Sequence, residues 1–159
     1  MKNINILGIS AFFHDSAVTL LQNGKIKYAS QEERFSRIKH DSNFPFNALA
    51  DLLKFNNLEL SQIDYVVFFE KPFLKFERLV ETYLAFAPSG FKQFLFSMPI
   101  WLKDKLFMKR QIINFLKQID SKFNEEKLFF SEHHLSHAAS AFFPSPFKKA
   151  IVFTADGVG

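Results

Sequence analysis

Apolar and polar residues near the start of the chain follow a pattern that predicts three consecutive strands. Ile4–Ser10 is an apolar, β-branched run with one glycine, and Ser16–Gln22 is a second apolar run. Lys25–Ser30 alternates polar and apolar residues, as a half-buried strand does. Between the last two runs, Asn23 and Gly24 form a strong hairpin signal, since both residues tolerate a positive φ. We therefore expect the chain to open with an antiparallel meander of three strands.

The middle of the chain changes to helical periodicity, with one strand in between. Glu32–Lys39 predicts a helical turn or polar loop, and Phe46–Phe55 predicts an amphipathic helix with its leucines near one face. Tyr65–Phe69 is a β-branched and aromatic run that predicts a buried central strand. Phe73–Asp120 predicts helices interrupted at residues 88–90. These helices are expected to form an insertion in a domain built on the strands.

The end of the chain predicts a strand, a helix and a further strand. Lys127–Ser131 and Ala150–Thr154 are short apolar runs typical of buried strands. Glu132–Phe143 is helical by composition and stops before Pro144. A glycine turn at residues 156–159 follows the last predicted strand. We therefore expect one complete α/β layer set, after which the last strand begins a second unit of similar kind.

Composition identifies an ordinary globular chain and excludes several kinds of chemistry. A chain of 159 residues has the size of one domain, and its 48% hydrophobic and 23% charged residues exclude disorder and coiled coil for the whole. There is no cysteine, which excludes disulfides, thiolate metal sites and cysteine nucleophiles. The 23 phenylalanines favour a Phe-rich core, with a membrane-surface role as the alternative. No transmembrane segment or signal peptide is predicted, so we expect a soluble, cytoplasmic protein.

The net charge of +4 comes from a single segment. Between Phe91 and Lys127 there are eight basic and four acidic residues, and the rest of the chain is neutral. Such local basicity favours a solvated helix face, and a surface for an anionic partner or a membrane is the alternative. It does not indicate a nucleic-acid interface, which would spread basic residues more widely, so no nucleic-acid partner is expected.

Three of the five histidines lie together near the start of the predicted helix at 132–143. His133 and His137 are four residues apart, which places them on one helix face, one turn from each other. Two imidazoles at this spacing can hold one metal ion. His134 points elsewhere, and the H-E-x-x-H pattern of zincins is absent because Glu132 precedes the first histidine. The alternative is a polar helix start with incidental histidines, and a metal site here needs a further ligand from elsewhere.

Three other segments carry side chains suited to chemistry. Residues 14–16 (His-Asp-Ser) follow the first predicted strand, where a histidine is well placed for acid–base work. A plain turn with Asp15 capping backbone amides is the alternative, and a triad of three consecutive residues is not expected. Residues 32–41 are crowded with ionisable groups, which indicates either a solvated loop or a site for an anionic or carbonyl group. Residues 156–159 (Asp-Gly-Val-Gly) could let backbone amides approach a phosphate.

Together these motifs resemble the O-carbamoyltransferase family, which includes the nodulation-factor and antibiotic carbamoyltransferases. The matching stretches, in the family's order, are GISAFFHDSAVTLLQNGKI, QEERFSRIKHDSNFP, EHHLSHAASAFFPSPF and TADGVG. They cover about a third of the chain, and the helical middle matches only in kind. The combination is highly specific, although each stretch alone is not.

The resemblance implies a fold and a domain organisation. The fold is α/β, an RNase H-like half-domain of the actin-like ATPase superfamily similar to the universal tRNA threonylcarbamoyltransferase. Its mixed sheet contains the antiparallel meander and has flanking helices. Residues 1–149 correspond to the first RNase H-like subdomain, with the helical insertion at about 73–120, and residues 150–159 to the first strand and loop of the second. We therefore expect a fragment, a split gene completed by a second chain, or a decayed gene, inactive by itself.

The resemblance also implies an activity. Members of the family transfer a carbamoyl group from carbamoyl-adenylate, made from carbamoyl phosphate and ATP, to a hydroxyl of a sugar or similar small molecule. His14 then corresponds to the group that helps deprotonate the acceptor, and Lys39 and His40 border the acyl-adenylate. His133 and His137 correspond to the family's pair of metal ligands, usually for iron. The start of the family's second nucleotide loop corresponds to Asp156, Gly157 and Gly159.

Two other functions stay open at this point. A tRNA-modifying enzyme of the same superfamily is the first, although the FHDSA and RIKHD stretches and the lack of a widespread basic surface disfavour it. A non-enzymatic binding module, with the basic Phe-rich helices as a membrane or partner surface, is the second. That module would leave the histidine cluster unexplained.

Overall fold

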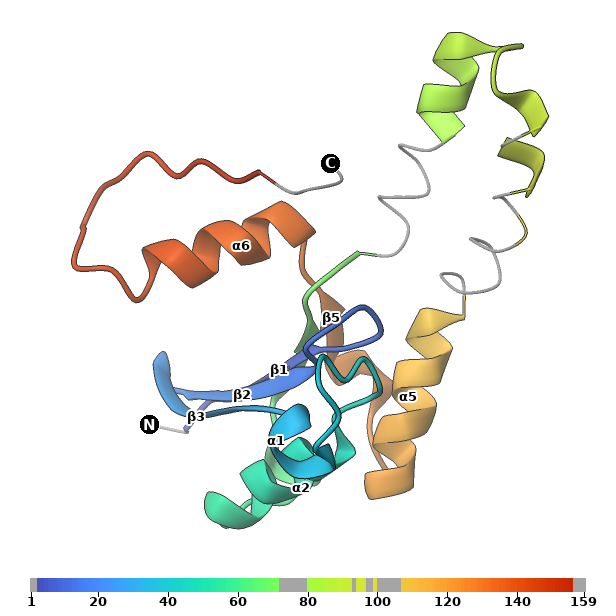
Figure 1. Cartoon of the computed structure of the whole chain (residues 1–159). Coiled ribbons are helices and arrows are strands. Elements are labelled where there is room, and N and C mark those ends of the chain that lie inside the picture. The colour runs from blue at the N-terminus through green and yellow to red at the C-terminus, as the bar shows by residue number, and fades with distance from the viewer. Residues whose placement is uncertain (1–2, 72–79, 93, 97–98, 100–106, 156–159) are drawn as a thin grey trace. The chain divides into compact units, whose positions relative to one another are not determined.

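The computed structural model describes residues 3–71, 80–92, 94–96, 99 and 107–155. The chain divides into two compact units, which Figure 1 shows in one cartoon. The first unit comprises Met1–Glu70 and Glu126–Gly159, and the second comprises Lys71–Glu125. The sheet and the sequence motifs of the first and third matching stretches all belong to the first unit.

The first unit is built on a five-stranded mixed sheet with the order β3-β2-β1-β4-β5. Antiparallel pairing joins β1 to β2 and β2 to β3, whereas β1, β4 and β5 run parallel to one another. The predicted meander is confirmed, and its three strands begin and end within one residue of the predicted bounds. The strands are β1 (Asn5–Ser10), β2 (Ala17–Gln22), β3 (Lys25–Gln31), β4 (Tyr65–Phe68) and β5 (Leu128–Phe130).

The hairpin between β2 and β3 has the predicted turn. Asn23 has φ 53° and Gly24 has φ 76°, so both central residues are left-handed, as a type I′ turn requires. The side-chain oxygen of Asn23 also accepts a hydrogen bond from the backbone N–H of Ile4 at 2.9 Å. This bond ties the hairpin turn to the residue that precedes β1.

One face of the sheet forms the core, because alternate residues of each strand point to the same side. Helix α2 (Phe46–Phe55) packs against β2 and β3 on this face, as Figure 1 shows, and its bounds are those predicted. Full burial of one such aliphatic side chain contributes about 1.5–3 kcal/mol. The buried side chains of the strands are Leu7, Ile9, Val18, Leu20, Val66 and Phe68, and those of the helix are Ala48, Leu49 and Leu52.

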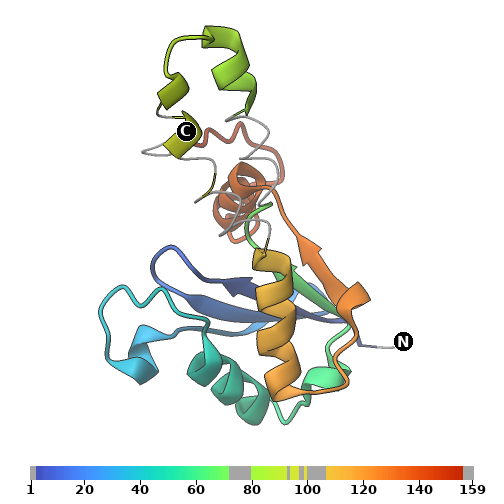
Figure 2. The same cartoon turned by 90° about the vertical axis from the view of Figure 1, so that its right-hand side faces the viewer.

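Short helices lie between the strands, and one longer helix follows the last described strand. Helix α1 (Glu33–Ser36) follows β3, η1 (Leu60–Gln62) precedes β4, and η2 (Glu125–Lys127) precedes β5. Helix α6 (His133–Phe142) follows β5 and confirms the predicted helix. Figures 1 and 2 both place α6 on the side of the sheet opposite α2. Helix α2 packs on one face of the sheet, whereas α6 lies on the side of the other face and has no buried residues.

The strand predicted at Ala150–Thr154 is wrong for the described structure. Residues 150–154 have no secondary structure, and Ile151 and Phe153 are 101% and 88% exposed. A strand exists only where a neighbouring strand takes up its backbone donors and acceptors, and no described strand pairs with this segment. The β-branched composition gives the segment a propensity for extended structure, but the described structure contains no neighbouring strand to pair with it.

The second unit is helical where it is described. Helix α5 (Met108–Ile119) buries four side chains, and residues 80–86 are also helical, as the periodicity predicted. Lys117 forms an ion pair with Glu125 at 2.5 Å. Much of the remaining predicted insertion, including residues 72–79 and 100–106, lies outside the described residues. None of the described helices combines the length and the apolar character that crossing a membrane requires. The buried side chains of α5 are Met108, Ile112, Ile113 and Leu116.

Candidate active site

One edge of the sheet gathers the segments that carry the sequence motifs. Because β1, β4 and β5 are parallel, their carboxyl ends at Ser10, Phe68 and Phe130 lie at the same edge. The antiparallel neighbours place the start of β2 and the end of β3 at that edge too. The loops 11–16 and 32–45, and the start of α6, therefore leave the sheet on one side. In open α/β sheets, ligands bind outside the carboxyl ends of the strands.

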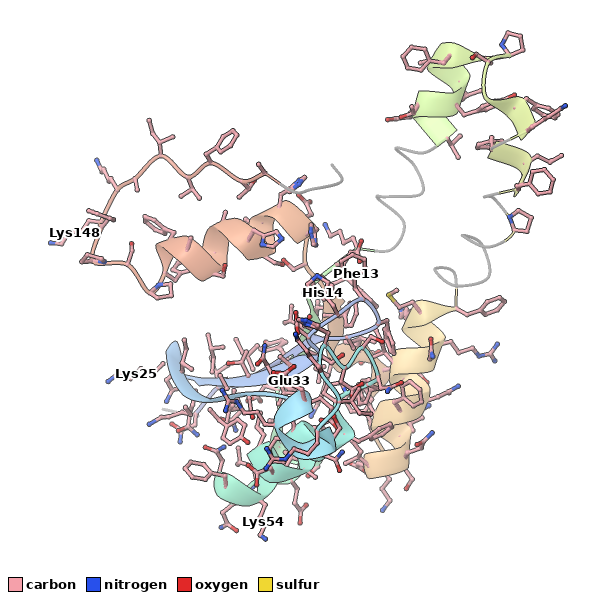
Figure 3. The ribbon with its side chains drawn as sticks, in the orientation of Figure 1. Phe13, His14, Lys25, Glu33, Lys54 and Lys148 are labelled. Atoms are coloured by element: carbon pink, nitrogen blue, oxygen red, sulfur yellow. The ribbon has the colours of Figure 1, made fainter. Side chains whose placement is uncertain are left out.

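Figure 3 shows this arrangement in the side chains. Phe13 and His14 lie above the edge of the sheet with Glu33 nearby, whereas Lys25 and Lys54 lie at the far ends of the hairpin and of α2. The sequence motif around His14 and the motif that contains Glu33 therefore meet in space.

Backbone hydrogen bonds join the loop after β1 to the loop after α1. The N–H of Phe12 donates to the carbonyl of Ser42, and the N–H of Ser16 donates to the carbonyl of Asp41, both at 2.8 Å. The carbonyl of Ser16 in turn accepts a bond from the N–H of Glu32, also at 2.8 Å. These three bonds hold the two loops in a defined register.

Both loops contain non-glycine residues in the left-handed region of φ. Phe12 has φ 72°, Asp15 50°, Arg37 60° and His40 55°. Such conformations cost free energy for residues with a Cβ and occur preferentially at functional sites. The ring of Phe12 lies 6.0 Å from that of Phe68, so packing against the core helps to hold the first of them.

Asp15 lies between two histidines. Its Oδ2 atom is 2.8 Å from Nδ1 of His14, and its Oδ1 atom is 2.9 Å from Nδ1 of His40. These hydrogen bonds, that from His40 above all, hold the pKa of Asp15 below its usual value. The same bond and the negative charge of Asp15 raise the pKa of His40. The interpretation of Asp15 as a cap for backbone amides is therefore wrong, since both of its oxygens face imidazoles.

His40 has a second acidic neighbour. Its backbone N–H donates to Oε2 of Glu33 at 3.1 Å, and the Glu33 charge contributes to the raised pKa of His40. Donor atoms of Asp15, Glu33 and His40 lie within 4.8 Å of one another. Lys39, the other residue predicted at the acyl-adenylate, is exposed, and its side chain forms no hydrogen bond with any part of the chain that the structure describes.

Ser16 takes no part in this cluster. Its hydroxyl is buried, at 1% residue exposure, and has no hydrogen-bond partner among the described residues. The expectation that His14, Asp15 and Ser16 form no triad agrees with this geometry. Asp41, next to His40, accepts hydrogen bonds from the backbone N–H and the side-chain amide of Asn43, at 3.0 and 2.8 Å. The backbone bond from Asn43 is the largest cause that lowers the pKa of Asp41.

A buried carboxylate that sequence reasoning missed accepts hydrogen bonds from the first turn of α2. Glu32 is 3% exposed, and its Oε2 atom accepts a hydrogen bond from the N–H of Ala48 at 2.8 Å. Its Oε1 atom accepts bonds from the backbone N–H and the side-chain amide of Asn47. Helix α2 begins after Pro45, which offers no side-chain cap. The sequence has no capping side chain at the predicted start of this helix. That lack was the signal that a residue distant in sequence must accept hydrogen bonds from the first N–H groups of the helix.

His133 and His137 come together on α6 as the spacing predicted. Their Nε2 atoms are 3.2 Å apart, and their rings are perpendicular, with centroids 4.6 Å apart. Two nitrogens bound ~2.1 Å from one tetrahedral metal ion stand roughly 3.4 Å apart, so this pair fits the separation that metal binding requires. Among the described residues, no third His, Asp or Glu places a ligand atom close enough to form a three-residue metal site with this pair. The ring of His134 is 5.8 Å from that of His133.

Contacts with Phe69, the residue that follows β4, fix the start of α6. The hydroxyl of Ser136 donates to the carbonyl of Phe69 at 3.0 Å, and the ring of Phe69 lies 5.7 Å from that of His133. The histidine pair is therefore anchored to the same edge of the sheet as His14. The predicted nucleotide-loop residues Asp156, Gly157 and Gly159 lie outside the described residues.

A cavity of about 620 Å³ lies between α6 and the face of the sheet opposite α2. Its walls are mostly apolar, and Arg34 of α1 reaches its boundary. Small side chains at the centre of the sheet leave this space, and a Cβ at Gly8 would meet Thr19 Cγ2 at 2.8 Å. The lining includes Gly8, Thr19, Val67, Phe69, Ser136 and Ala139.

Comparison with known proteins identifies relatives along nearly the whole chain. A family model described as Carbamoyltransferase N-terminus matches residues 5–159. An uncharacterized protein of Synechocystis is 51% identical over 157 residues, which are 98% of this chain and 26% of that protein. The nodulation protein NolNO of Sinorhizobium fredii is 29% identical over 153 residues, 94% of this chain and 20% of that protein. An uncharacterized protein of Methanocaldococcus jannaschii is 30% identical over 98% of this chain and 31% of its own length. The chain thus spans between a fifth and a third of these relatives.

Proposed function

The chain belongs to the family of carbamoyltransferase N-terminal regions, and we propose that it forms one wall of an O-carbamoyltransferase active site. The reaction is transfer of a carbamoyl group from carbamoyl-adenylate, made from carbamoyl phosphate and ATP, to a hydroxyl of a sugar or similar small molecule. The fold is then the first RNase H-like half of the enzyme. The chain alone is inactive, and the remainder of the enzyme, in the same or a second polypeptide, supplies the other wall.

The observation that carries this proposal is the convergence of two histidine sites at one edge of the sheet. His14 follows β1, and the His133–His137 pair opens α6, which follows β5. Parallel pairing of β1, β4 and β5 brings these distant segments to the same side. This is the place where an α/β sheet binds its ligand.

His133 and His137 are the residues that would hold a metal ion, iron above all, through their Nε2 atoms, whose separation of 3.2 Å supports that role. Such an ion would supply Lewis-acid polarisation of a carbonyl or phosphoryl oxygen of the carbamoyl-adenylate. Phe69 packs beside His133 and limits the directions in which that ring can turn. The remaining ligands come from outside the described residues.

His14 is the general base in this proposal. Its side chain is 59% exposed, so substrate can reach the imidazole, and its Nδ1 atom faces Asp15. Attack of the acceptor oxygen forms a C–O bond to the carbamoyl carbon, and the bond from that carbon to the phosphate oxygen of AMP breaks. The hydroxyl proton passes to His14, and AMP leaves with the bonding electron pair.

Basic residues in the adjoining loop and at the cavity match the anionic carbamoyl-adenylate. Lys39 and His40 lie in the loop bonded to the His14 loop, and Arg34 borders the cavity beside β1 and β2. Guanidinium and imidazolium groups form strong hydrogen bonds with phosphate oxygens. Asp156, Gly157 and Gly159 complete the contacts to the nucleotide in this proposal.

Carbamoyl transfer by a reconstituted enzyme tests the proposal. The chain is mixed with the complementary part of the full-length Synechocystis relative, carbamoyl phosphate, ATP and a panel of sugars, and carbamoylated products are detected by mass spectrometry. We expect ATP-dependent transfer with both parts and none with either part alone. His14→Ala abolishes transfer and the control His134→Ala retains it.

A full-length protein carrying this N-terminal region that forms no carbamoylated product from any hydroxyl acceptor would overturn the assignment. Salt-sensitive binding of tRNA by that same protein would instead favour the tRNA-modifying class.

A further inference from the structure

The Asp15 carboxylate holds two imidazoles at once through equivalent ring atoms. Oδ2 faces Nδ1 of His14 at 2.8 Å, and Oδ1 faces Nδ1 of His40 at 2.9 Å. His14 is the neighbour of Asp15 in sequence, whereas His40 lies 25 residues after Asp15, in another loop. Their common orientation is therefore a product of the fold around Asp15, not of sequence spacing.

The backbone supports this arrangement on both sides of Asp15. The N–H of Ser16 donates to the carbonyl of Asp41, the residue that follows His40. Asp15 and His40 both have left-handed φ values, of 50° and 55°. These conformations turn each side chain toward the other loop at a cost that the inter-loop hydrogen bonds offset.

The Asp15 carboxylate decides which ring nitrogen of each histidine carries the proton. An ionised carboxylate only accepts hydrogen bonds, so Nδ1 of each neutral ring must be the N–H donor. The Nε2 atom of each neutral imidazole is then the proton acceptor. The side chains of His14 and His40 are 59% and 61% exposed, so substrate can approach these rings.

We propose that Asp15 is a positioning residue that fixes His14 in the Nδ1–H tautomer and aligns His40 beside it. The inference rests on the proposed function, because it assigns His14 Nε2 as the atom that accepts the hydroxyl proton. In this arrangement the hydrogen bond to Asp15 raises the pKa of His40 and so favours its cationic form beside the carbamoyl-adenylate. Asp15 thus gives the two neighbouring histidines different tasks: His14 presents Nε2 to the hydroxyl proton, and the bond from His40 favours the cationic form of that ring.

The charged surroundings agree with this division. Asp15 and Glu33 face His40, and both raise its pKa. His14 and His40 face Asp15, and both lower its pKa. Lys39 and Asp41 flank His40 in sequence, and the Asp41 side chain is engaged by Asn43.

Nitrogen NMR of the whole 159-residue chain tests the inference without any enzymatic reaction. With 15N-labelled histidine, we expect the neutral form of His14 to carry its proton on Nδ1, whereas an unconstrained imidazole favours Nε2–H. Asp15→Asn removes the charge, and we expect the titration midpoint of His40 to move to lower pH. Asp15→Gly removes both hydrogen bonds, and we expect His14 to return to the Nε2–H form. Asn and Gly both tolerate the left-handed φ at this position, so each variant keeps the loop conformation.

The control is Glu81→Gln, an acid-to-amide change at an exposed position of the other unit. It should leave the His14 tautomer and the His40 titration midpoint unchanged. A neutral His14 with its proton on Nε2 in the unmodified chain overturns the inference. An unchanged His40 midpoint in both Asp15 variants, with the chain still folded, overturns it as well. Failure of carbamoyl transfer alone would overturn the proposed function and leave these NMR results as they are.

Discussion

The buried carboxylate of Glu32 and the backbone N–H of Ala48 lie 2.8 Å apart and join the end of β3 to the first turn of α2. Glu32 belongs to the same stretch as Glu33 and His40, but its side chain points into the fold, not toward the candidate active site. It supplies the acceptor that the start of α2 lacks, because Pro45 has no capping side chain. The stretch therefore has two roles, one structural at Glu32 and one at the surface.

Replacing Glu32 with alanine should destabilise the first unit strongly. The change leaves the N–H groups of Asn47 and Ala48 without their acceptor in a part-buried or buried setting, which costs about 1–3 kcal/mol. Urea unfolding followed by circular dichroism measures this loss. Glu81→Ala, at an exposed helical position, is the control and should shift the unfolding free energy by less than about 0.5 kcal/mol. Equal effects of the two substitutions would contradict a capping role for Glu32.

A hydrogen bond between β3 and α2 leads to a second prediction. The hydroxyl of Tyr28 donates to Asp51 of α2, and burial, followed by this bond, raises the pKa of Tyr28. Tyr28→Phe removes the donor and should lower the unfolding free energy by about 1 kcal/mol. The matched control is Tyr65→Phe in β4, where the tyrosine is 45% exposed and stacks edge-on with Phe129. If the thermal melts of the two variants coincide, the hydrogen bond from Tyr28 to Asp51 contributes nothing to the stability of the fold.

Hydrophobic patterning predicted most of the first unit because its elements depend on local signals. The meander follows from alternation and from Asn23-Gly24, whose positive φ values are an intrinsic property of those residues. Helix α2 follows from periodicity, and α6 follows from composition and from Pro144, before which it ends. The prediction at Ala150–Thr154 was wrong because a strand also requires a partner, which lies outside local information.

The Asp15 cluster was beyond sequence reasoning for a different reason. Arg37 and His40 both adopt left-handed conformations, which are uncommon for residues other than glycine and which no local pattern placed at these two positions. Adjacent residues rarely meet in catalytic geometry, yet His14 and Asp15 form a hydrogen bond because Asp15 is also left-handed. The His133–His137 pair, in contrast, was predictable, since a spacing of four within one helix fixes the distance.

The ion pair of Asp15 and His40 should make stability depend on pH in a defined window. The pKa of folded Asp15 is lowered, so its contribution is present above the ordinary value of 3.8 and is lost as pH falls through the folded value. The pKa of folded His40 is raised, so its contribution is present below the ordinary value of 6.5 and is lost as pH rises through the folded value. The pair therefore stabilises most between pH 3.8 and 6.5.

Denaturant unfolding of the unmodified chain and of Asp15→Asn measures this dependence. We expect the difference in unfolding free energy between the two proteins to be larger near pH ~5.5 than near pH ~8.5. Added salt should reduce the difference, because both side chains are partly exposed and salt screens such pairs. A difference that is constant over this range would show that the charges of Asp15 and His40 are not coupled.

Metal binding by α6 is the last prediction and depends on the Nε2 separation of 3.2 Å. Titration of the chain with Zn²⁺, followed by histidine NMR, should shift the His133 and His137 signals together, and EDTA should reverse the shift. His133→Ala or His137→Ala should weaken binding by at least ~10-fold, because one ligand of a shared ion is lost. His134→Ala is the matched control, since this residue lies in the same helical turn but outside the close Nε2 pair. Zn²⁺ uptake that survives loss of both His133 and His137 would place the metal elsewhere and remove the chemical reason for their spacing.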